Sequence, residues 1–112
     1  MQSREERIAR NDATFRAANE KIADYASDHE FVDQVPFICE CATESCLMVV
    51  DLSIAEYEEV RSSPIRFFVA PGHQASEGNV SMVDDRGRYV LVEKDGRAGE
   101  IARDLDPRSP FR

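Results

Sequence analysis

The stretch that decides the fold runs from Phe37 to Cys46 and reads FICECATESC. It holds all three cysteines of the chain, Cys39, Cys41 and Cys46, in a C-x-C-x4-C pattern. An odd number of cysteines argues against a closed disulfide framework. Three thiols within eight residues instead indicate a metal site, because thiolates are favoured ligands of zinc. We therefore predict one Zn²⁺ that joins this segment to the rest of the core.

The spacing of these cysteines suits tetrahedral coordination. Alternate side chains of an extended segment share a face, so Cys39 and Cys41 can turn toward one ion. The four residues that follow give the chain room to return with Cys46. The fourth ligand must come from elsewhere. His73, just after a predicted strand and turn, is the preferred candidate, and His29 is the alternative. Four protein ligands would make the zinc structural rather than catalytic.

Upstream of the cysteines, residues 4–27 are predicted to form one long helix. Alanines and charged residues, which favour helix, fill most of its positions. Apolar residues recur at three-, four- and seven-residue steps, and this stripe predicts the face that packs on the core. The same stripe would suit a dimer interface. It consists of Ile8, Phe15, Ala18, Ile22 and Tyr25.

Downstream, Ser53 and Glu56 match a capping box and begin a second helix over residues 54–62, which Pro64 ends. A hairpin is predicted over residues 80–93, with its turn at Asp84-Asp85-Arg86-Gly87. A short final helix follows, over about residues 98–105. The fold class is therefore α+β: a long N-terminal helix, a small antiparallel sheet of about four short strands, short helices and a zinc-stabilised centre. The predicted strands are 47–52, 66–70, 80–83 and 89–93, with a short extended segment at 37–39.

Length and composition fit one domain. With 112 residues, 42% of them apolar, the chain can form a single core, which we assign to residues 1–106. Residues 107–112 contain two prolines and are predicted to be a flexible tail. Neither an apolar run long enough to span a membrane nor a secretory signal pattern occurs, so a cytoplasmic location is expected.

The net charge of −8 is concentrated around the cysteines. Residues 29–62 carry eight acidic side chains and one basic side chain, Arg61. Direct binding to nucleic acid is disfavoured, because that affinity comes largely from basic side chains. A basic surface of a partner protein is the expected complement. The residues predicted to meet such a partner are Glu40, Glu44, Glu56, Glu58 and Glu59.

These features predict a zinc-stabilised module that acts in protein interaction or regulation. The common nucleotide-binding and hydrolase motifs are absent from the sequence, so no enzymatic activity is expected and no catalytic residue is assigned. The alternative is a cysteine–zinc redox switch, and a small enzyme comes third. The neighbouring carboxylates of Glu40 and Glu44 would raise the pKa values of the thiols, which counts against the redox switch.

Most of the chain also resembles a family of short, uncharacterised bacterial proteins. The resemblance rests on an F-[IL]-C-E-C pattern, a later cysteine, an E-Y-E-x-V-R segment and a P-G-H segment. In this chain these are residues 37–41, Cys46, residues 56–61 and residues 71–73. A glycine commonly follows the C-x-C pair in the family, where this chain has Ala42. The resemblance supports His73 as the partner of the cysteines and implies no activity.

Overall fold

The computed structural model describes residues 4–29, 33–41, 46, 48–73 and 80–108. These residues confirm the α+β class, with a long N-terminal helix, short later helices and antiparallel strands. The elements, in chain order, are α1 (Arg4–Asp28), β1 (Val35–Ile38), β2 (Val49–Leu52), α2 (Ile54–Val60), β3 (Arg66–Val69), β4 (Val80–Asp85), β5 (Val90–Lys94) and α3 (Gly96–Asp104).

The strands form two small antiparallel sheets where the sequence suggested one. β1 pairs with β2, and a second sheet has the order β3-β5-β4. The sheets stay separate because the backbone of Ile38, at the end of β1, bonds to the side chain of Asn19 in α1. One backbone bond beyond the strand, from Glu40 N–H to Phe68 C=O, links β1's continuation to β3.

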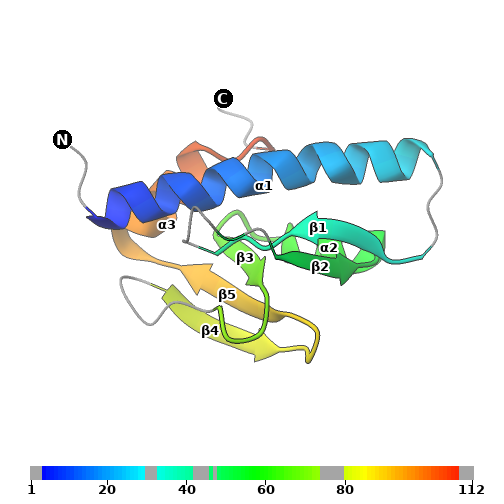
Figure 1. Cartoon of the computed structure of the whole chain (residues 1–112). Coiled ribbons are helices and arrows are strands. Elements are labelled where there is room, and N and C mark those ends of the chain that lie inside the picture. The colour runs from blue at the N-terminus through cyan, green and yellow to red at the C-terminus, as the bar shows by residue number, and fades with distance from the viewer. Residues whose placement is uncertain (1–3, 30–32, 42–45, 47, 74–79, 109–112) are drawn as a thin grey trace.

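Helix α1 runs along one side of the molecule (Figure 1). Its C-terminal half lies beside β1, and α3 packs against it nearer the N-terminus. The strands of the β3-β5-β4 sheet lie on the same side of α1 as the β1–β2 pair (Figure 1). Residues 39 and 40 lie between the two sheets, because the Cys39 N–H bonds to the Met48 C=O before β2 and the Glu40 N–H bonds to the Phe68 C=O in β3.

The predicted core-facing stripe of α1 is wrong for most of its members, and only Ile22 among them packs against the main core. Ile8, Phe15, Ala18 and Ile22 are only half-buried, and Tyr25 is 59% exposed. The buried face combines small and polar side chains, because alanines let the helix approach closely while polar groups bond to the backbone beneath it. Its members are Ala9, Asp12, Ala13, Arg16, Asn19, Ala23 and Ala26.

The main core combines aromatic rings with the cysteines. Phe37 and Tyr57 stack with ring centroids 4.5 Å apart, and Phe68 meets both rings edge-on. Tyr89, which directly precedes β5, adds a fourth ring to this cluster, with its centroid 6.5 Å from that of Phe68. The three cysteines belong to the same buried cluster. This packing holds β1, α2 and β3 in one unit around the cysteine segment.

The capping box of α2 is confirmed. The Ser53 hydroxyl accepts the Glu56 N–H at 3.1 Å, and the Glu56 carboxylate accepts the Ser53 N–H at 2.8 Å. The hairpin differs from its prediction because β4 continues through Asp85, and a register shift between Met82 and Asp84 takes up one residue. The turn lies two residues later, at residues 86–89, and its Gly87 has a φ of +80°, which suits glycine.

Candidate metal centre

Three separate segments bring the predicted ligands together. Cys39 and Cys41 follow β1 directly, and Cys46 precedes β2. His73 follows β3 after a tight turn, in which Gly72 has a φ of +85° and the His73 N–H bonds to the Ala70 C=O at 2.9 Å. The chain therefore returns at the end of β3 with its imidazole aimed at the cysteines.

The ligand atoms of these four residues form one tight group. One atom from each of Cys39, Cys41, Cys46 and His73 lies within 4.8 Å of the others. His73 Nδ1 is 3.4 Å from the Cys46 Sγ and 3.7 Å from the Cys39 Sγ. Zinc bonds of about 2.0–2.3 Å at tetrahedral angles place ligand atoms about 3.5–3.8 Å apart. The geometry is thus that of a group able to hold a metal ion.

The site is closed on its inner side. All three cysteines are buried, and His73 is half-buried. The Cys39 Sγ accepts the Ala70 N–H at 3.1 Å, a bond that favours a thiolate. Burial raises the pKa of the Cys39 thiol well above its ordinary value, and the neighbouring cysteines raise it further. A bound cation would reverse this preference by stabilising the thiolates directly.

His29, the alternative fourth ligand, lies elsewhere. It is exposed at the end of α1, where its ring stacks on Tyr25 with centroids 3.9 Å apart. Its Nδ1 is 2.9 Å from the backbone oxygen of the same tyrosine. It is not part of the group of candidate ligands found among the described residues.

Glu40, between two of the cysteines, is not a surface residue. It is only 1% exposed, because alternation along the segment turns it inward, away from Cys39 and Cys41. Its carboxylate accepts the Asn19 Nδ2–H at 2.9 Å and the Phe68 N–H at 3.4 Å. Burial raises its pKa to about 7, although a nearby arginine opposes the shift. The prediction that Glu40 meets a partner is therefore wrong.

Asn19 is the second residue that shapes this segment, and the sequence did not single it out. Its Oδ1 accepts the Ile38 N–H at 2.8 Å, and its Nδ2 donates to the Ile38 C=O at 2.8 Å and to Glu40. One amide thus closes the edge of β1 and holds the residue between the ligands. The only signal in the sequence was its place on the alanine-rich face of the helix.

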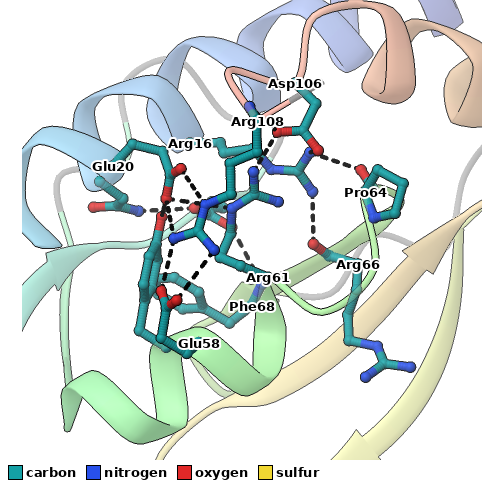
Figure 2. Close-up of polar contacts among 12 residues, drawn as sticks. Arg16, Glu20, Glu58, Arg61, Pro64, Arg66, Phe68, Asp106 and Arg108 are labelled. Carbon is teal, nitrogen blue, oxygen red and sulfur yellow. Dashed lines mark hydrogen bonds and ion pairs between the residues drawn. The ribbon is translucent and has the colours of Figure 1, made fainter. Parts of the chain in front are cut away.

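A network of charged groups, largely buried, lies beside Asn19 and Glu40 and centres on Arg16, Arg61 and Asp106 (Figure 2). Arg16 donates to the carbonyls of Pro64 and Arg66 at 2.7 and 2.6 Å, and its guanidinium lies 3.6 Å from the centre of the Phe67 ring. Burial lowers the pKa of Arg16 to about 10. Asp106 pairs with Arg61 and lies 3.9 Å from Arg16. These groups fasten α1 and the C-terminal segment to α2 and β3.

The other predicted partner-binding glutamates have arginine partners within this chain. Glu56 pairs with Arg88, Glu58 with Arg108 and Glu59 with Arg86. Arg108, which the sequence assigned to a flexible tail, also pairs with Glu20 (Figure 2). Glu44 lies outside the described residues. The acidity of this surface is therefore partly neutralised by the chain itself.

Comparisons with protein-family models, with curated proteins and with solved structures give no significant match. Among the described residues, none of the helices has the length and apolar character needed to cross a membrane. The function must therefore be argued from the site itself.

Proposed function

We propose that the protein is a small module held together by one structural zinc ion and that it acts through protein interaction or regulation. The convergence of Cys39, Cys41, Cys46 and His73 on one point carries this proposal. Three thiolates and an imidazole are a donor set that zinc accepts readily, whereas calcium and magnesium require oxygen ligands.

A structural role follows from the number and burial of the ligands. Four protein ligands leave no position for a water molecule or a substrate on a tetrahedral ion. Burial of all three sulfurs also limits access by oxidants, which supports a stabilising role over a redox switch. The ion would tie β1, β2 and the end of β3 to one another.

The interaction role rests on charge. The chain carries a net charge of −8, which favours a basic partner and opposes nucleic acid. Because Glu56, Glu58 and Glu59 already contact arginines of this chain, a partner at that surface would have to displace them. Carboxylates without such internal pairs are better placed to meet it.

Native mass spectrometry of the purified chain tests the metal assignment. The wild type is expected to carry one zinc ion, and Cys41→Ser and His73→Ala are expected to lose it or bind it more weakly. His29→Ala is the matched control and is expected to keep the ion. A metal-free wild type, or loss of zinc in the His29 variant alone, would contradict the proposal.

A further inference from the structure

An apolar groove lies between the C-terminal half of α1 and strand β1. Its volume is about 370 Å³, near the lower end of the range for ligand pockets, so it can accept one or two side chains. Apart from the ammonium group of one lysine, its walls are hydrocarbon and aromatic. The lining residues are Lys21, Ile22, Tyr25, Ala26, Val35 and Pro36.

The apolar surface continues from the groove onto the outer face of the β1–β2 pair. Pro36 and Ile38 share one face of β1, and Ile38 lies opposite Val49 in β2. Val49 is 59% exposed, as is Tyr25 on the helix side of the groove. A continuous exposed apolar surface of this kind is characteristic of interaction sites.

Four exposed aspartates lie on or next to the elements that carry this surface. Asp24 and Asp28 stand beside the lining residues of α1, Asp33 precedes β1, and Asp51 lies opposite Pro36. All four side chains are exposed, and none forms an ion pair with another residue in the described part of the chain. The carboxylates here are thus without the arginine partners that the glutamates of α2 have, and the one arginine contact at this surface is from Arg88 to the backbone oxygen of Asp51, among the described residues.

The arrangement restricts what can occupy the groove. A second copy of this chain would bring two surfaces together that each carry four aspartates and one lysine, Lys21, so that like charges outnumber opposite ones. An added strand at the end of β1 is also blocked, because Asn19 already bonds the N–H and C=O of Ile38. The occupant that remains is a segment of another protein, which would bind in the groove through its side chains.

We propose that the groove binds a peptide segment of a partner protein that inserts a large apolar side chain between Lys or Arg residues. The proposal deepens the interaction role proposed above and rests on it. The apolar side chain fills the space beside Tyr25 and Pro36, while the basic residues face the aspartates. The zinc site adjoins this surface, because Cys39 follows Ile38 directly.

Selection from a phage-displayed library of random peptides of about twelve residues tests this inference on the zinc-loaded full chain. The enriched peptides are expected to share one or two large apolar residues flanked by Lys or Arg. Their affinity is expected to fall at least tenfold for Tyr25→Ser, as for a central aromatic contact. It is also expected to fall for Asp28→Asn combined with Asp51→Asn, with a weaker salt dependence.

Met82→Ser is the matched control, because Met82 is equally exposed, at 60%, but lies on β4 in the other sheet. Peptides without the basic–apolar pattern, equal binding to Tyr25→Ser, or no enrichment would each overturn the inference. Self-association through the groove, seen by sedimentation, would also overturn it. Zinc content measured on the same samples separates the two proposals: one zinc without groove binding defeats only this one, and groove binding by a metal-free chain defeats only the metal assignment.

Discussion

At the scale of single residues, Asn19 connects α1 to the segment that carries two of the candidate metal ligands. It satisfies both backbone groups of Ile38 and one oxygen of Glu40, on either side of Cys39. Groups that orient ligands from outside the coordination sphere typically change metal affinity by about 10–100-fold when they are mutated. Asn19 therefore acts on the site without touching it.

Replacing Asn19 with Ala is expected to weaken zinc binding by about 10–100-fold, because the segment carrying Cys39 and Cys41 loses its fixed orientation. Competition with a chromophoric chelator measures this affinity.

The control is Asp12→Asn, which disturbs the buried ion pair of α1 with Lys94, away from the cysteine segment. It is expected to lower stability and leave zinc affinity unchanged. Equal weakening by both variants would show that Asn19 acts only through the stability of the fold.

The ligand group could be predicted from sequence because thiols and imidazoles carry their chemistry in their identity and spacing. The three cysteines lie within eight residues of the sequence, at Cys39, Cys41 and Cys46. His73 follows a Pro-Gly turn that the sequence also shows. Asn19 could not be predicted, since an amide bonds equally well to solvent or to backbone. Its role depends on which strand lies beneath the helix.

At the scale of elements, α1 shows what sequence periodicity can and cannot predict about a helix. Its extent was predicted to within one residue at the C-terminal end, because helix propensity is a local property. The buried face of α1 was not predicted correctly, because the prediction gave the larger apolar side chains more weight than the alanines. The helix docks through Arg16 and Asn19, whose partners are backbone groups that no sequence pattern reveals.

Arg16→Ala tests this mode of docking. The variant loses bonds to two carbonyls and the stack on Phe67, and it removes the positive charge that does most to lower the pKa of the buried Glu40. Breaking a buried charge network on one side typically costs about 3–5 kcal/mol. Urea unfolding followed by circular dichroism measures the loss.

Arg86→Ala supplies the comparison, because Arg86 forms ion pairs at the surface with Glu59 and Asp84. Its stability is expected to match the wild type within error, since solvent screens exposed pairs. Similar losses in the two arginine variants would mean that the buried network does not anchor the helix.

At the scale of the whole molecule, the buried apolar side chains of the described residues form two clusters of different size. The larger contains the aromatic rings and all three cysteines. The smaller lies where α3 meets the N-terminal half of α1 and contains Ala9, Ala98 and Ile101, with Leu105 packed against it. The candidate metal ligands Cys39, Cys41 and Cys46 belong to the larger cluster alone.

Removal of the metal should therefore destabilise the whole chain and act first on the larger cluster. A ligand present at about 1,000 times its dissociation constant stabilises a fold by about 4 kcal/mol. For a domain of this size, each kcal/mol shifts the melting temperature by about 4–8 °C. Chelation is thus expected to lower the melting temperature by more than about 10 °C, as measured by calorimetry.

Hydrogen exchange in the chelated chain should rise earlier in β1, β2 and β3 than in α3, because the four ligands hold those strands together. Chelation should lower the melting temperature of Cys41→Ser, which binds zinc weakly or not at all, much less than that of the wild type. An unchanged melting curve after chelation would mean that the thiols and the imidazole pack stably without an ion, and the structural role of zinc would be lost.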